Sequence, residues 1–131
     1  MIPMSPGVAF GVLLLTFISV THLIRPDIWR DVIREWARQG APGVTLYAML
    51  HVIPGSVLVV LSMNDTTIAG RVVLVYGLIL TIKGTVYVLL ADRMSEYLQR
   101  WCAMSIARWR SPGVVGPVLV AGLVMLSRSG A

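Results

Sequence analysis

Lys83 is the only lysine in the chain, and it lies in a stretch that otherwise has the composition of a membrane-spanning helix. A lysine at the centre of such a helix costs roughly 2.5–3.5 kcal/mol on insertion scales, so its charge needs a partner, a water-filled path or a chemical role. His51 in the preceding apolar stretch and Lys83 are equally distant from Thr67, and so are Tyr47 and Tyr87. Each tyrosine is four residues from its basic neighbour, so each pair shares a helix face. The sequence therefore predicts a polar cluster of Lys83, His51, Tyr47 and Tyr87 inside the membrane.

Three interpretations of Lys83 stay open. No acidic residue lies within the apolar stretches, so the ammonium would bind an anionic lipid, a ligand carboxylate or an acid of another subunit. With His51 it would instead line an anion or proton path, because histidine relays protons. Alternatively, Lys83 extends along its four-carbon stem toward Asp92 and the headgroups, and His51 bonds a carbonyl freed by Pro54. Tyr76 lies two helical turns from Lys83 on the same face.

His51 is also the residue at which a cofactor contact is conceivable, since a lone helical histidine can ligate haem or a chlorophyll-type pigment. A bis-histidine haem would need His22 at the same depth, but His22 lies at the end of its apolar stretch. Bound lipid is the more strongly expected non-protein component. Cys102 is the only cysteine and fits no metal-ligand spacing, so we expect a small apolar residue and no metal site. No phosphate-binding loop or nucleophile elbow occurs, so we predict no catalytic residue and do not expect an enzyme.

The composition predicts the fold that must position this cluster. The 131 residues are 56% hydrophobic with a mean hydropathy of +0.80, which excludes an ordinary soluble protein. We predict an all-α fold, a four-transmembrane-helix bundle with two amphipathic interfacial helices, forming one integral-membrane domain over 1–131. The predicted spans cover 4–24, 42–63, 71–91 and 112–127, and the interfacial helices 27–39 and 95–110.

Aromatic and basic side chains gather on the two interfacial helices. In the second, the apolar face is expected to include Leu98, Trp101, Cys102 and Trp109. Tryptophans beside membrane spans form an aromatic belt at headgroup level, although they would also suit a docking surface for a partner. The predicted interfacial anchors are Trp29, Trp36, Trp101, Trp109, Arg30, Arg34 and Arg108.

The placement of arginine predicts the orientation of the chain. Eight arginines follow the first and third spans, and two, Arg71 and Arg128, fall on the opposite side. By the positive-inside rule both long linkers are cytoplasmic and both termini are outside. The N-terminal segment carries no Lys or Arg, so we expect it to be kept as a span and not removed as a signal peptide. The high pI, near 10.2, thus reflects topology and not nucleic-acid binding, and the pattern is typical of a bacterial cytoplasmic (inner) membrane.

The chain also shows signs of an internal two-fold repeat. Pro42-Gly43-Val44 is echoed by Pro112-Gly113-Val114, each before a predicted span. A shift of 65 residues aligns four further pairs, which are Thr16 with Thr81, Ser19 with Gly84, His22 with Tyr87, and Asp27 with Asp92. We interpret these as two parallel repeats of span, amphipathic linker, turn and span, an arrangement that often places a site at the repeat interface.

Small residues form stripes on two of the spans. Gly77, Thr81 and Gly84 lie on one face of the third span, which allows close approach of another helix. Gly116 with Ala121 and Gly122 gives the fourth span a partial stripe. Packing within the chain is the favoured interpretation, and contact with a foreign helix is the alternative.

Two short stretches carry a resemblance. Leu23-Ile24-Arg25-Pro26-Asp27-Ile28-Trp29 and Ile82-Lys83-Gly84-Thr85-Val86-Tyr87 resemble a loose group of small four-span bacterial membrane proteins of unassigned function. The resemblance covers roughly residues 10 to 95. It implies a four-span fold and no activity, and Ala91 stands where those proteins tend to have proline.

Two classes of function remain open from the sequence. The chain is expected to be an accessory or structural subunit of a larger membrane complex, in an energy-converting system or another, with membrane lipids and other membrane subunits as partners. The alternative is a small homo-oligomeric channel or transporter for anions or protons that uses Lys83 and His51. The absence of chemical motifs favours the first class.

Overall fold

The computed structural model describes residues 4–129, which form six helices and, within that range, no strand. Four helices are long and apolar enough to cross a membrane, which indicates a multi-pass membrane protein. The expected location of the two termini concerns residues 1–3 and 130–131, which lie outside the described range. The helices are α1 (Pro6–Ile24), α2 (Pro26–Arg38), α3 (Ala41–Ser62), α4 (Ile68–Leu89), α5 (Ala91–Cys102) and α6 (Ile106–Ser129).

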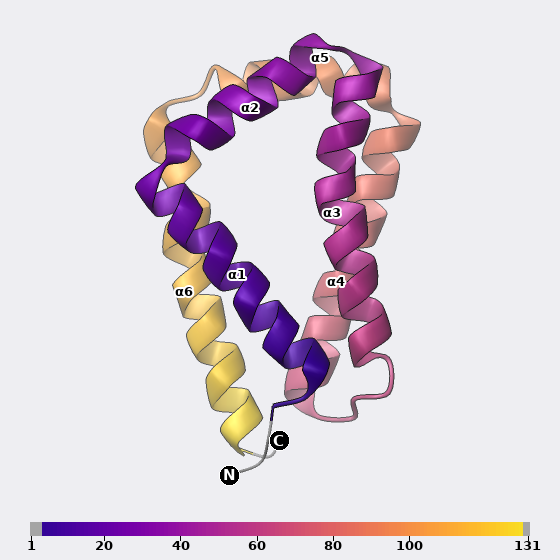
Figure 1. Ribbon diagram of the computed structural model, residues 1–131, viewed down its shortest axis with the longest axis vertical. Helices are drawn as coiled ribbons and strands as arrows, with labels where there is room; N and C mark the ends of the chain where they lie inside the picture. Colours follow the sequence, from indigo (N-terminus) through magenta and orange to yellow (C-terminus); the bar gives the residue numbers. More distant parts are fainter. Residues whose placement is uncertain (1–3, 130–131) are drawn as a thin grey trace.

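The four long helices form two antiparallel pairs (Figure 1). Helix α1 packs along α6, although they are far apart in the chain, and α3 packs along α4. The two pairs converge at the end that carries the α3–α4 connection, and α2 and α5 bridge them at the other end (Figure 1). The described fold is therefore a helical bundle whose two halves are splayed toward the α2–α5 layer.

Proline and glycine mark several helix boundaries. Pro6, Pro26 and Pro42 lie in the first turn of α1, α2 and α3, where a missing N–H breaks no hydrogen bond. Gly40 has φ of +69°, a left-handed conformation that glycine adopts without steric cost. It ends α2 and turns the chain into α3.

The α3–α4 connection is built around Asp65. Its Oδ1 accepts hydrogen bonds from the amide of Thr67 at 3.0 Å and from the Thr67 hydroxyl at 2.7 Å. The same hydroxyl caps α4 by accepting from the amide of Gly70 at 3.0 Å. The neighbouring hydroxyls of Ser5 and Thr67 hold the pKa of Asp65 below its usual value.

Replacing Asp65 with alanine is expected to lower the free energy of unfolding by about 1 kcal/mol at neutral pH, because both bonds to Thr67 are lost. The folded-state pKa of Asp65 is lowered, so its contribution is present above the unfolded-state pKa and disappears as pH falls through the folded-state value. Denaturant unfolding in detergent micelles, at neutral pH and again at about pH 3, measures both effects. Asp65→Asn is the control, since it keeps an acceptor without the charge. An equal loss for Asp65→Ala at both pH values would contradict the ionic contribution.

The connection between α5 and α6 differs from the expected boundaries. The interfacial helix was expected over 95–110, but α5 ends at Cys102 and α6 already begins at Ile106. Pro112, expected at the start of the span, therefore lies inside α6, as does Pro117, which the predicted span already contained. The proline at 112 would leave the carbonyl of Arg108 without its helical donor, and the Ser111 hydroxyl donates to that oxygen at 2.7 Å. This local replacement lets the helix continue where the sequence alone indicated a boundary.

The α2–α5 layer is held by buried side chains and by hydrogen bonds between the two helices. The Ala37 carbonyl accepts from the Ser95 hydroxyl at 2.8 Å and from Gln99 Nε2 at 3.2 Å. The Cys102 carbonyl accepts from Arg34 Nη2 at 3.3 Å. The buried cluster beneath these bonds consists of Ile33, Ala37, Val44, Tyr47, Leu98, Cys102 and Trp109.

Candidate intramembrane site

Close packing of α3 against α4 sets the geometry of the predicted cluster. A Cβ atom added to Gly84 would lie 2.8 Å from the carbonyl oxygen of Ala48, and one added to Gly77 would lie 2.9 Å from that of Gly55. The two backbones therefore approach more closely than any larger residue would permit. The stripe of small residues on the third span consists of Gly77, Thr81 and Gly84. Both of its glycines face α3, and Thr81 lies beside Gly55.

The structure brings all four cluster residues together. The ring centroids of Tyr47 and His51 are 4.8 Å apart, and Tyr87 stacks on Tyr47 at 5.6 Å with an interplanar angle of 18°. His51 meets the edge of Tyr87 at 5.7 Å. Lys83 Nζ lies 5.6 Å from the Tyr87 ring centroid, within the range of a cation–π contact. Helical rise and an antiparallel hairpin are sufficient to align these residues in depth.

His51 has a defined hydrogen-bond partner. Its Nδ1 lies 3.1 Å from the carbonyl oxygen of Tyr47, so Nδ1 donates and Nε2 remains an acceptor in the neutral ring. The expectation that His51 would bond a carbonyl freed by Pro54 was wrong, because the oxygen it uses lies on the preceding turn, four residues earlier. This bond fixes the orientation of the imidazole ring.

Lys83 has no counter-ion within residues 4–129. Its side chain is exposed, and neither an ion pair nor a hydrogen bond joins it to another described side chain, Asp92 included. It lies six residues before the end of α4, or about 9 Å along the helix axis. The ammonium lies against the ring of Tyr87.

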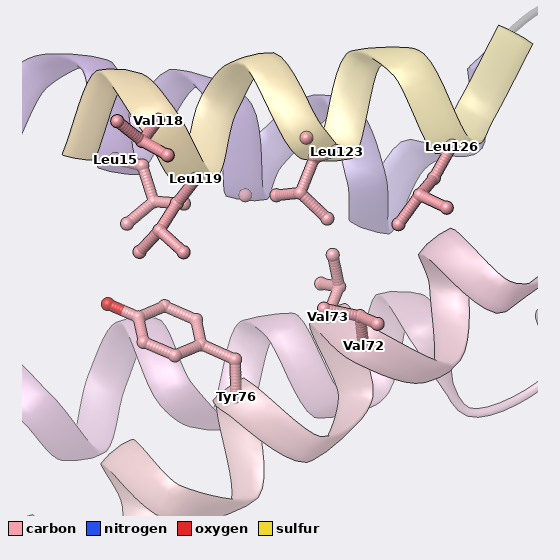
Figure 2. Close-up of a pocket in the computed structure, with 10 residues that line it drawn as sticks. Leu15, Val72, Val73, Tyr76, Val118, Leu119, Leu123 and Leu126 are labelled. Carbon is pink, nitrogen blue, oxygen red and sulfur yellow. The ribbon is translucent and has the colours of Figure 1, made fainter. Parts of the chain in front are cut away.

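Tyr76 does not join the cluster. It borders an apolar cavity of about 220 Å³ between α4 and the α1–α6 pair (Figure 2). Figure 2 shows its hydroxyl directed toward the Leu15 and Val118 side of the cavity, away from Leu126. The cavity itself had no signal in the sequence, since its lining looks like any other apolar span.

His22 lies in the other helix pair. Its ring stacks on Trp29 at 4.9 Å with an interplanar angle of 16°, and its Nδ1 lies 2.8 Å from the Ile18 carbonyl oxygen. His51 packs instead on two tyrosines, so the two histidines have separate surroundings. Among residues 4–129, no group of three or more His, Cys, Asp or Glu side chains could hold a metal ion. A cofactor contact at His51 stays a prediction.

The predicted interfacial anchors fall into two groups. Trp29, Trp36 and Trp101 are partly buried, whereas Trp109 is 2% exposed and belongs to the buried cluster of the α2–α5 layer. Its ring lies 4.3 Å from that of Trp101, because α6 begins early enough to carry it into the core. Arg30 and Arg34 pair with Asp31 on the outer face of α2, and Arg108 donates to the Met104 sulfur.

Cys102 is buried in the α2–α5 layer, and this burial raises the pKa of its thiol. A raised pKa leaves little thiolate, so the residue behaves as a small apolar side chain.

The two glycines of the fourth-span stripe have different surroundings. A Cβ on Gly116 would clash with the Ser19 hydroxyl of α1, whereas one on Gly122 would meet nothing within 4 Å.

The molecule belongs to the helical membrane proteins by virtue of its four candidate spans. No protein family, no curated protein and no solved structure matches this chain. Its function is therefore inferred from the packing of the spans and from the intramembrane cluster.

Proposed function

We propose that this chain is an integral-membrane accessory subunit of a larger membrane complex, and that it holds other membrane components without transforming a substrate. The observation that carries the proposal is the small buried share of two spans, each of which is packed on one side only. Only 17% of the apolar window is buried in α4 and in α6, against 33% in α1. A helix that faces a bundle core presents a stripe at least 100° wide, or more than about a quarter of its surface. Surfaces of α4 and α6 are thus available to another component.

Lys83 gives a second, independent reason. An unpaired cation within a span is costly, and the described residues contain no acid that pairs with it. Its neutralising group therefore comes from outside this chain. That requirement suits a protein whose role is to bind membrane components.

We further propose that the chain consists of two parallel repeats with α2 and α5 as interfacial helices at the cytoplasmic side of a bacterial inner membrane. In support, a shift of 65 residues relates the ends of α1 and α4, Ile24 and Leu89, and also the starts of α2 and α5 and of α3 and α6. The other three boundaries agree with this shift within three residues. The interhelical bonds from Arg34 to Cys102 and from Gln99 to Ala37 are related by the same shift. So are three buried pairs, which are Ile33 with Leu98, Ala37 with Cys102, and Val44 with Trp109. Arg71 and Arg128 then lie on the outer side.

The channel alternative receives less support. The cavity between the helix pairs is lined by aliphatic side chains and glycine, with the Tyr76 hydroxyl as the only polar side-chain group. An ion path needs polar or charged groups along its length. A liposome flux assay in which Lys83→Met abolishes a strong conductance would favour the channel over the accessory subunit.

Native purification tests the accessory role. The chain is expressed at natural levels, extracted in mild detergent and examined by native mass spectrometry. We expect one or more foreign membrane subunits in fixed stoichiometry. A monomer or homo-oligomer that carries no foreign subunit, in several detergents and in a detergent-free polymer extract, would overturn the proposal.

A further inference from the structure

One face of α4 carries both an apolar hollow and the unpaired charge. Val72 and Tyr76 line the cavity, and Lys83 and Tyr87 follow on the same face toward α5. Lys83 is seven residues beyond Tyr76, or about 10 Å along the helix axis. A molecule lying along this face would meet apolar side chains first and the ammonium next.

A glycine in the wall of the cavity leaves space that a larger side chain would occupy. It has a volume of about 220 Å³ and is bounded by α1, α4 and α6 (Figure 2). Gly122 contributes no side chain to the wall, and a Cβ there would meet nothing within 4 Å. Helix packing therefore does not explain this glycine, in contrast to Gly116, which is tightly packed against Ser19.

The lining determines what can fill the cavity. A cavity holds water only where the water finds two to four polar partners, and here the Tyr76 hydroxyl is the only polar side-chain group. Val118 and Leu119 are exposed, so the hollow opens at the outer surface of the helix bundle, which would face the bilayer. Lipid acyl chains are therefore the molecules that can enter the cavity through this opening.

We propose that one anionic phospholipid binds between the two helix pairs, with an acyl chain in the cavity and its phosphate at Lys83. The charge decides the class of lipid, because Lys83 has no acid partner in the described chain and a phosphate provides strong charge-assisted acceptors. The Tyr87 ring steadies the ammonium at 5.6 Å. This site does not require a partner subunit, so it goes beyond the proposed accessory role, with which it shares only the argument from the unpaired charge of Lys83.

Lipid retention by purified variants tests the site. The full chain is reconstituted in micelles that contain equal amounts of phosphatidylglycerol and phosphatidylcholine, then analysed by native mass spectrometry. Wild type is expected to retain one phosphatidylglycerol. Lys83→Met should lower its preference over phosphatidylcholine at least about tenfold, since a bond to a charged group is lost. Gly122→Leu fills the cavity and should reduce retention of both lipids.

Two matched controls separate the site from general effects. Arg71→Met removes a charge from the other end of α4, and Ala121→Leu adds bulk beside Gly122 at a residue that does not line the cavity. Both are expected to retain phosphatidylglycerol as wild type does. If Lys83→Met and Arg71→Met lose the preference equally, or Gly122→Leu retains as much lipid as Ala121→Leu, the proposal is wrong.

Wild-type protein provides a measurement that does not depend on how the variants fold. A phosphatidylglycerol with a photoreactive acyl chain is incorporated, irradiated and mapped by peptide mass spectrometry. Adducts should concentrate on cavity residues such as Leu15, Leu123 and Leu126, which bulk lipid reaches less readily. Adducts spread evenly over outward-facing residues such as Leu13 and Ile79 would show bulk lipid contact only and would overturn the site.

Discussion

Replacing Gly84 with leucine is expected to separate α3 from α4 and lower the free energy of unfolding by about 3 kcal/mol or more. A Cβ at this position would lie 2.8 Å from the Ala48 carbonyl oxygen and 3.0 Å from the Val52 backbone nitrogen. Because both are backbone atoms, the whole helix must move to relieve the contact. The loss extends to the intramembrane cluster, since His51 and Tyr87 meet only while the two helices are in close contact.

Thermal unfolding in detergent micelles and near-ultraviolet circular dichroism of the tyrosine rings measure the two effects of Gly84→Leu. Gly122→Leu is the matched control, because the same change there meets nothing within 4 Å. The control is expected to unfold at the wild-type temperature or above it, since the leucine side chain has the cavity to enter and leucine favours helix over glycine. Equal unfolding temperatures for the two variants would contradict the close packing of α3 and α4.

Trp109→Ala has the second large expected effect, a loss of about 3–5 kcal/mol in the free energy of unfolding. Trp109 is 2% exposed, and it joins the first turn of α6 to the buried side chains of α2 and α5. Its ring lies 4.3 Å from that of Trp101, so an aromatic contact is lost together with the buried surface. Truncation leaves a cavity that the three helices cannot all close.

Comparison with Trp29→Ala separates core packing from membrane anchoring at Trp109. Trp29 is only partly buried, so its removal should cost clearly less in a denaturant series in micelles. An interfacial anchor would show a different pattern, in which both variants unfold near the wild-type midpoint but bind membranes less well. That result at Trp109 would contradict its place in the core.

Much of the intramembrane cluster was accessible from the sequence. Four apolar stretches of about twenty residues have few structures open to them besides spanning helices, because backbone groups in lipid must be satisfied internally. A short polar connection makes the second and third spans antiparallel neighbours. Equal distances from Thr67 then place His51 opposite Lys83, and helical rise alone fixes their depth. No other element of the fold had to be known.

The rotation of each helix about its axis could not be predicted from the sequence. A soluble helix shows which face it buries by alternating apolar and polar residues, but these spans are apolar on every side. The hydrophobic pattern therefore does not predict that Tyr76 borders a cavity while Tyr87, on the same face of α4, packs on α3. Nor does it predict that Gly122 differs from Gly116. Only the packed structure separates a glycine that admits a neighbouring helix from one that leaves a hollow.

The sequence by itself determined the number of spans, the depth of the polar residues and the small-residue face of α4, because hydrophobic length and helical repeat depend on local order alone. The tertiary structure decided the pairing of α1 with α6, the burial of Trp109 and the cavity beside Tyr76. Each of these depends on contacts between segments distant in the chain. Such contacts depend on the shape of both partners, and one apolar surface does not specify which other apolar surface it will meet.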